Sequence, residues 1–250
     1  MRRAQPEQPE HKGQNGMKAA VYTGTRELYQ HMVPAIKSLL ANSDVDVIYL
    51  LIEDSKFPYE LPDICKIIDV HDQTYFRQDS ENMKSRFTYM AMMRAVLSKV
   101  LPQDLSRVLS LDVDTIVDQD ISELWELPIN DCYFAATHEW HKAEEGFLYC
   151  NAGVTLFNLD KMRDGKTDEL IRVLNKIKLE FLEQDALNIL CQGHIYDMPP
   201  EYNSQYYSEP VESPKIIHHI GYNGALPNYP DVQKYAAMSF DEIMNRRAKK

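Results

Sequence analysis

Apolar residues along the chain follow two alternating patterns, short continuous runs and longer stretches with helical spacing. Short runs at 18–23, 46–52 and 66–70 predict strands, because polar or turn-forming residues bound each of them. After the first run, residues 27–42 repeat apolar positions every three or four residues, which predicts a helix. The chain therefore begins as alternating strands and helices, which is typical of a parallel sheet.

The same alternation continues to the end of the chain. Residues 83–101 predict one long helix that ends before Pro102, and residues 107–111 predict the strand that follows it. Further strands are expected at 132–137, 153–159 and 215–220, with helices at 167–192, breaking near Glu183, and at 240–250. These elements imply an α/β fold with a mostly parallel sheet and helices on both faces, and such sheets bind ligands at the carboxyl ends of their strands.

Length and charge narrow the class of protein. A chain of 250 residues suits one large α/β domain, and a net charge of −11 disfavours nucleic acid and anionic lipid as partners, since both need clustered cations. Residues 1–16 are polar and lack apolar periodicity. We therefore expect a disordered N-terminal segment over 1–16 and a single domain over 17–250.

Cysteine usage and hydropathy indicate a cellular compartment. The four cysteines are far apart in sequence and form no metal-binding cluster, which indicates free thiols of a reducing compartment. They are Cys65, Cys132, Cys150 and Cys191. The sequence shows neither a transmembrane run of about 20 apolar residues nor the apolar core of a signal peptide, so we expect a cytoplasmic protein without a transmembrane segment.

Several common catalytic motifs are absent from the sequence. The segment at 22–29, after the first predicted strand, lacks the three glycines of a dinucleotide-binding turn. A phosphate-binding lysine loop and a serine nucleophile elbow are also missing. Dehydrogenase, P-loop nucleotidase and serine-hydrolase functions are therefore disfavoured, and carboxylates remain as the candidate chemistry.

Pairs of aspartates separated by one residue occur three times, so their position decides which pair matters. The pair at 44–46 precedes a predicted strand, and in the pair at 118–120 one aspartate can cap the short helix that follows. Asp112 and Asp114 instead follow the strand at 107–111, at its carboxyl end. This pair alone is placed for a ligand.

Asp112 and Asp114 can share one metal ion, because side chains two residues apart in extended chain point the same way. Their oxygens suit a hard cation such as Mn²⁺ or Mg²⁺. A cation held there can bridge a diphosphate and neutralise the charge that develops as it leaves. A solvated turn at the end of a strand is the structural alternative.

Two further segments carry polar side chains that can join this site. In 215–220, His218 and His219 point to opposite faces of a strand, so one of them can supply the nitrogen that Mn²⁺ accepts beside carboxylates. A histidine satisfied within the core is the alternative. In 182–188, the acidic residues and Gln184 begin a helix, where they can stabilise or attack a cationic sugar transition state, or simply complement the helix dipole.

Taken together, these segments resemble glycosyltransferase family 8, the retaining galactosyl- and glucosyltransferases that include glycogenin and bacterial lipopolysaccharide galactosyltransferases. The resemblance spans roughly residues 18–237, and its motifs occur in the family's order. They lie at 20–29, 85–102, 107–125, 149–163, 182–188 and 216–221. The resemblance implies a GT-A, Rossmann-like fold of one domain, a UDP-linked sugar donor and Mn²⁺.

The match to the family's motifs also implies roles for individual residues. The implied metal ligands are Asp112, Asp114 and His218. The implied catalytic candidates beside the donor sugar are Asn151, Gln184 and Asp185. Donor contacts are implied for the two aspartates, Asn151 and Gln184, and for Thr23, Gly24, Thr25, Tyr29, Val113, Ala152 and Gly221, with Arg86 or Arg94 as a cation.

Three positions depart from the family pattern. The lysine that meets the diphosphate in many relatives is Gly224 here, so the metal or another cation must stabilise the leaving group. The family's arginine position is Ala91, whereas Arg94 lies one helical turn further on the same side and is favoured over Arg86 as its substitute. Glu183 replaces the first aspartate of the D-Q-D motif, which keeps the charge and lengthens its reach.

The sequence therefore predicts a retaining hexosyltransferase that moves glucose or galactose from a UDP-sugar to a hydroxyl of a saccharide or protein acceptor. A nucleotide-sugar-binding protein with weak or lost turnover is the second interpretation, because the family lysine is missing. A nucleotidyltransferase is a third, although the segment at 22–29 lacks the glycine-rich basic loop that it needs. The sequence leaves open which acceptor is used and whether the chain forms a homodimer.

Overall fold

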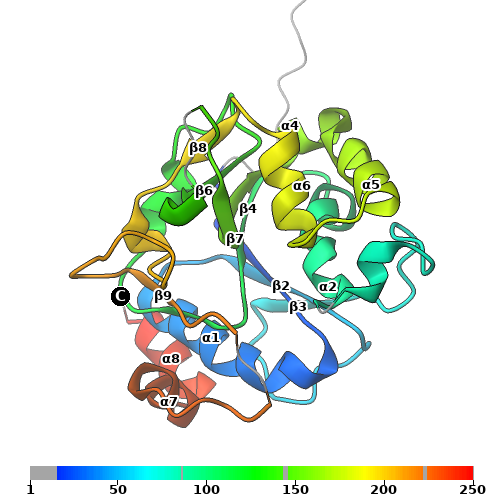
Figure 1. The fold of residues 1–250 in the computed structure, drawn as a ribbon. Coiled ribbons are helices and arrows are strands. Elements are labelled where there is room, and N and C mark those ends of the chain that lie inside the picture. The colour runs from blue at the N-terminus through cyan, green and yellow to red at the C-terminus, as the bar shows by residue number, and fades with distance from the viewer. Residues whose placement is uncertain (1–15, 86, 143–145, 222–223, 250) are drawn as a thin grey trace, which may run out of the picture.

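The computed structural model describes residues 16–85, 87–142, 146–221 and 224–249. Within these ranges a seven-stranded sheet runs in the order β3-β2-β1-β4-β7-β6-β8 (Figure 1). Its strands are β1 (Ala19–Thr23), β2 (Val47–Ile52), β3 (Cys65–Asp69), β4 (Arg107–Leu111), β6 (Phe134–His138), β7 (Cys150–Asn158) and β8 (Ile195–Asp197). Strand β7 is antiparallel to both neighbours and the other pairings are parallel, which confirms the mostly parallel mixed sheet.

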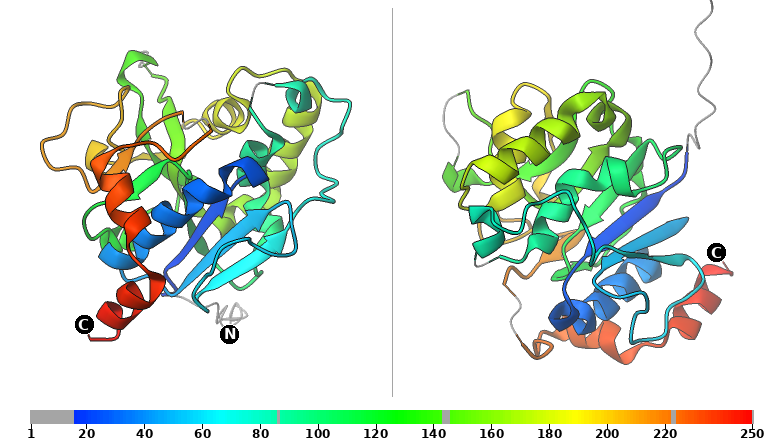
Figure 2. Two further views of the ribbon diagram at one scale, coloured as in Figure 1. Left: turned by 90° about the horizontal axis from the view of Figure 1, so that it is seen from below. Right: turned by 90° about the vertical axis from the view of Figure 1, so that its right-hand side faces the viewer.

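Strand β1 shows how the sheet divides the core into two layers. Ala20 and Tyr22 pack into one hydrophobic cluster, whereas Ala19 and Val21 pack into the cluster on the opposite face, because side chains alternate along a strand. Helices cover both faces (Figures 1 and 2). One layer holds α1 (Tyr29–Asn42), α7 (Pro230–Ala237) and α8 (Phe240–Arg247), and the other holds α2 (Tyr89–Met92), α3 (Leu97–Val100), α5 (Thr167–Lys176) and α6 (Leu182–Leu190).

Two short strands outside the main sheet bring distant parts of the chain together. Strands β5 (Thr115–Val117) and β9 (Ile216–His218) pair antiparallel, with Thr115 opposite His218. This register places the histidine beside the residues that follow β4. The predicted strand at 215–220 is therefore confirmed in a shorter form.

The remaining elements are short. They are η1 (Arg26–Leu28), η2 (Glu81–Lys84), η3 (Met93–Val96), η4 (Ser122–Glu126), η5 (Trp140–Lys142), α4 (Leu159–Lys161), the π-helical η6 (Met162–Lys166) and η7 (Pro200–Tyr202). None of the helices in the described ranges combines the length and apolar content that a membrane crossing requires. The predicted disordered segment lies, apart from Gly16, outside the described residues.

The prediction of one long helix over 83–101 is wrong. Ser85 and Thr88 are extended, with ψ angles of 160° and 154°, so the helix begins only at Tyr89. It then tightens into the 3-10 turn η3, in which all four residues are buried. A segment buried on every side lacks the exposed face of an amphipathic helix, and its packing decides its shape.

The predicted break in the helix over 167–192 is confirmed, but it lies at 177–181, ahead of Glu183. The Asn82 amide donates to the carbonyls of Leu174 and Ile177 at 2.7 and 2.8 Å, and its oxygen accepts from the Leu179 backbone N–H at 3.0 Å. These bonds close the end of α5. Helix α6 begins at Leu182 and carries the predicted catalytic residues Gln184 and Asp185 in its first turn.

Candidate functional site

The carboxyl ends of β1 and β4 lie side by side and form the floor of the candidate site. Gly24 directly follows β1, and a Cβ atom there would lie 2.6 Å from Cε of Met32 and 3.6 Å from Cγ1 of Val113. A side chain at this position would require the end of the Met32 side chain to move. The structure thus places Thr23, Gly24 and Val113, all predicted donor-binding residues, at one edge of the sheet, where open α/β sheets bind ligands.

Asp112, Asp114 and His218 converge at this edge. Each offers one potential ligand atom, and these atoms lie within 4.8 Å of one another. Nε2 of His218 lies 3.1 Å from Oδ1 of Asp114 and 3.8 Å from Oδ2 of Asp112. The side chain of Asp112 is 32% exposed, against 4% for His218, so the group opens to solvent on the Asp112 side.

The environment of the three side chains fits a divalent cation. Burial opposes a charged imidazole, but the carboxylates of Asp114 and Asp112 outweigh it and raise the pKa of His218. Burial likewise opposes the charge on Asp114, yet His218 and the Gly221 N–H, which donates to Oδ2 at 2.9 Å, lower the pKa of Asp114 to about 2. Two carboxylates and one imidazole form the mixed oxygen and nitrogen set that suits Mn²⁺.

A chain of buried amides fixes the orientation of the His218 ring. Glu139 can only accept, so the Asn151 amide N–H faces it at 2.9 Å, and the Asn151 oxygen accepts from the Asn203 amide at 3.0 Å. The Asn203 oxygen then faces Nδ1 of His218 at 2.9 Å. This order assigns the proton to Nδ1 and directs Nε2 toward the carboxylates, which is the arrangement of a metal-ligating histidine.

Gly153 is a site residue that the sequence reasoning missed. A Cβ atom at this position would lie 2.1 Å from Cε1 and 2.7 Å from Nδ1 of His218. Its carbonyl accepts from the Asp112 backbone N–H at 2.8 Å. Gly153 therefore makes room for the His218 ring and holds the backbone of Asp112. Its position inside the motif at 149–163 was the available signal.

Arg94 supplies a cation to the site, whereas the other predicted candidate, Arg86, lies outside the described residues. Its guanidinium donates to Oδ1 of Asp112 at 2.6 Å and to the Ala152 carbonyl at 2.8 Å, and it forms an ion pair with Glu183. Arg94 and Glu183 are 8% and 1% exposed. Arg94 therefore joins Asp112 to the start of α6.

Gln184 and Asp185 are held against β7. The Gln184 oxygen accepts from the Ala152 backbone N–H at 2.9 Å, and its amide donates to the Tyr149 hydroxyl at 3.1 Å. That hydroxyl donates to Oδ1 of Asp185 at 2.5 Å, and Oδ2 accepts from the Phe181 N–H at 2.8 Å. The structure thus brings Ala152, Gln184 and Asp185 together, next to Asn151.

The other predicted donor-binding residues serve the loops around this edge. The hydroxyl of Tyr29 donates to Asp54 at 3.0 Å and accepts from the Glu53 N–H at 2.9 Å, and burial raises its pKa to about 12. The carbonyl of Thr25 accepts from the Leu28 N–H at 2.9 Å. The carbonyl of Gly224, which stands at the family's lysine position, accepts from the Gln30 amide at 2.6 Å and is thereby tied to α1.

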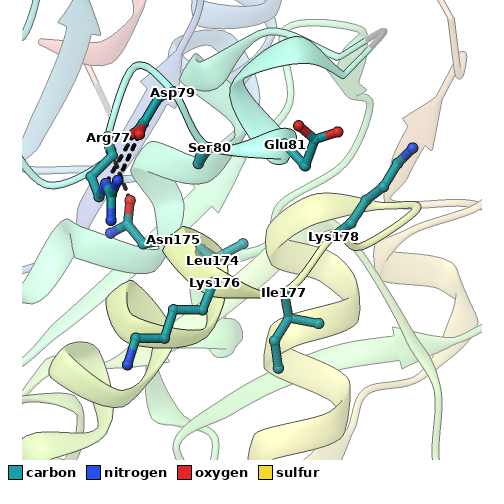
Figure 3. Close-up of a pocket in the computed structure, with 9 residues that line it drawn as sticks. All are labelled: Arg77, Asp79, Ser80, Glu81, Leu174, Asn175, Lys176, Ile177 and Lys178. Carbon is teal, nitrogen blue, oxygen red and sulfur yellow. Dashed lines mark hydrogen bonds and ion pairs between the residues drawn. The ribbon is translucent and has the colours of Figure 1, made fainter.

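A surface hollow elsewhere in the molecule does not belong to this site. It lies between residues 77–81 and the end of α5, with Arg77 paired to Asp79 at 2.6 Å (Figure 3). Its volume of about 170 Å³ is smaller than the roughly 300–1,000 Å³ of typical ligand pockets. It contains none of the predicted site residues.

This fold and site define a class of protein. A mostly parallel mixed sheet, flanked by helices and carrying an Asp-x-Asp pair and a histidine at its strand ends, has the GT-A, Rossmann-like architecture of glycosyltransferases. The profile described as Glycosyl transferase family 8 matches residues 22–224. The chain belongs to that family.

Individual relatives agree with this assignment. A Haemophilus influenzae protein named as a glycosyltransferase is 32% identical over 89 residues, which cover 30% of this chain and 27% of that protein. The structure of the glycosyltransferase GlyE from Streptococcus pneumoniae superposes with a TM-score of 0.70 at 23% identity, covering 93% of this chain and 63% of GlyE. The galactosyltransferase LgtC, solved with donor and acceptor sugar analogs, gives a TM-score of 0.69 at 17% identity, covering 91% and 99%.

The matched proteins differ in how much of their length this chain covers. The chain spans about a quarter of the Haemophilus protein and less than two thirds of GlyE. At these identities the solved structures establish the fold. The family membership supports glycosyl transfer.

Proposed function

We propose that this protein is a retaining hexosyltransferase that transfers glucose or galactose from a UDP-sugar to an acceptor hydroxyl. Asp112, Asp114 and His218 would hold Mn²⁺, with Mg²⁺ as a possible replacement. The observation that carries the proposal is the convergence of these three side chains at the carboxyl end of β4. A divalent cation there supplies charge neutralisation for a departing diphosphate.

The residues of the chain have distinct roles in this proposal. Arg94 fixes the carboxylate of Asp112 through Nη1. The donor nucleotide lies along the turn at 23–25, next to Val113. Gln184 and Asp185, held by Ala152 and Tyr149, face the donor sugar together with Asn151, where an amide and a carboxylate can stabilise positive charge at the anomeric carbon.

A donor screen tests the proposal without knowledge of the acceptor. UDP release from UDP-glucose, UDP-galactose and UDP-N-acetylglucosamine is measured with Mn²⁺, with Mg²⁺ and with EDTA. We expect release from one of the two hexose donors with Mn²⁺, weaker release with Mg²⁺ and none with EDTA. Equal release in EDTA would contradict the metal assignment, and release from UDP-N-acetylglucosamine alone would contradict the hexose assignment.

A second candidate function is nucleotide-sugar binding with weak or lost turnover. It is favoured by Gly224, which brings no cation to the position of the family's lysine. Donor binding without UDP release across a broad panel of saccharide and protein acceptors would support it.

Four free thiols accord with either function in a reducing, cytoplasmic setting.

A further inference from the structure

Four aromatic side chains gather on the surface next to the candidate site. They come from two loops, one after β6 and the other after η7, and we call them the aromatic platform: Trp140, His141, Tyr206 and Tyr207. Trp140 is 56% exposed, Tyr206 86% and Tyr207 38%. Large aromatic side chains usually bury most of their surface, so an exposed group of them indicates a binding surface.

The two loops hold the rings in fixed positions. The Trp140 backbone N–H donates to the Tyr207 carbonyl at 3.1 Å, and the rings of His141 and Tyr207 lie 4.6 Å apart. The Tyr206 and Tyr207 rings meet edge to face at 5.1 Å. The Gln205 side chain accepts from the Tyr207 N–H at 2.8 Å and closes the turn. A surface ordered in this way loses little entropy when a ligand binds.

The platform is continuous with the amides that orient His218. Glu139, directly before Trp140, accepts from Asn151, and Asn203, three residues before Tyr206, donates to Asn151. Each of the two loops therefore begins next to a residue that is hydrogen-bonded to Asn151. A ligand on the platform lies beside the predicted position of the donor sugar.

We infer that the aromatic platform is a stacking subsite for the pyranose rings of a saccharide acceptor. A pyranose has one apolar face of C–H groups, which packs on an aromatic face, and hydroxyls around its rim, which need polar partners. The platform offers the aromatic faces. The adjoining Lys142, whose ammonium lies 3.4 Å from Glu139 and 4.0 Å from the centre of the Tyr149 ring, is the polar group at its edge. The inference rests on the proposed function, and it favours a saccharide acceptor because the exposed rings adjoin the residues predicted to face the donor sugar.

The two tryptophans of the chain make the inference testable by fluorescence. Trp125 is 6% exposed and its indole N–H donates to the Ala19 carbonyl at 3.0 Å. The wavelength of its fluorescence emission should therefore not change when a ligand binds at the surface. Maltotriose, cellotriose, β-1,4-galactotriose and chitotriose are titrated into the protein with saturating UDP and Mn²⁺. The Trp140→Phe variant supplies the blank, and this readout requires no turnover.

We expect at least one trisaccharide to shift the Trp140 emission to the blue with a millimolar Kd. Saturation-transfer NMR should show Trp140→Ala and Tyr206→Ala each weakening that binding at least tenfold, while Ile189→Ala, which removes a side chain 55% exposed on α6, leaves it unchanged. UDP affinity should stay constant in all three variants. The result that would overturn the inference is the absence of any Trp140 shift with all four sugars, or equal binding by Trp140→Ala.

The saccharide titration, repeated without UDP and combined with separate titrations of UDP and of protein acceptors, separates this inference from the proposed function. Saccharide binding at Trp140 without any UDP binding would support the saccharide subsite and contradict the transferase proposal. UDP binding with Mn²⁺ and no saccharide shift would support the donor site and overturn the platform. Binding of a protein acceptor that is insensitive to Trp140→Ala would also overturn it.

Discussion

Arg94 and Glu183 form a buried ion pair that links η3 to the first turn of α6. Glu183 is a position at which the sequence departs from the family pattern, and Arg94 is the predicted substitute for the arginine missing at Ala91; the two meet in one contact. An arginine placed one turn later is matched by an acid that is one methylene longer. The ion pair holds the Arg94 guanidinium against Asp112.

The first prediction concerns the stability of this pair. Arg94→Met should cost about 3–5 kcal/mol of unfolding free energy, because it leaves the Glu183 carboxylate buried without a partner. Arg94→Met combined with Glu183→Leu should cost clearly less than the sum of the single changes. Urea denaturation measures all three proteins. Arg77→Met, which breaks an exposed pair with Asp79, serves as control and should change stability by less than about 1 kcal/mol.

Additive costs in that cycle would mean that the two side chains do not depend on each other. That result would contradict a role for the ion pair in holding Arg94 against Asp112.

The second prediction concerns the space beside His218. Gly153→Ala places a methyl group where the imidazole stands, 2.1 Å from Cε1, so the ring must move away from Asp114. Mn²⁺ affinity should fall at least tenfold, while the circular dichroism spectrum stays that of the folded protein. The paramagnetic broadening of water protons by Mn²⁺ reports this affinity, and wild-type affinity in the variant would show that His218 is not a ligand.

The third prediction concerns the amide that orients the same ring. Asn203→Leu removes the oxygen that faces Nδ1, so Mn²⁺ affinity should drop by about 10- to 100-fold, the usual effect of losing a partner of a metal ligand. Asn203→Asp keeps an acceptor oxygen there and should retain more of the affinity. The reverse order of the two variants would contradict the tautomer assigned to His218.

Sequence periodicity predicted most of the sheet, and motif position selected the side chains that converge in the candidate metal site. Asp112 and Asp114 could be selected because they follow a buried strand, and strand ends are where α/β sheets bind ligands. The break after α5 and the late start of α2 were mislocated, because contacts distant in sequence decide them, such as that of Asn82 with Leu174. The sequence did not predict three residues that position His218, because their contacts form only in the folded chain. They are Gly153, which leaves room for the ring, and Glu139 and Asn203, which belong to the hydrogen-bonded chain that ends at its Nδ1.

The fourth prediction concerns stereochemistry. A retaining transferase keeps the α configuration of the donor sugar in the new linkage. The NMR coupling constant of the anomeric proton in the product measures this directly once an acceptor is in hand. A β linkage from an α-linked UDP-sugar would rule out the retaining mechanism and leave the metal site untouched.

The most direct test of the central claim is calorimetric titration of UDP into the metal-free protein and then into the protein with Mn²⁺. The account predicts tight binding only with Mn²⁺, loss of that binding in Asp114→Asn, and unchanged binding in Asp118→Asn, which alters an Asp-x-Asp pair outside the site. No binding in either condition, or equal binding with and without Mn²⁺ in the wild-type protein, would contradict the assignment of Asp112, Asp114 and His218 as a metal site for a nucleotide-sugar donor.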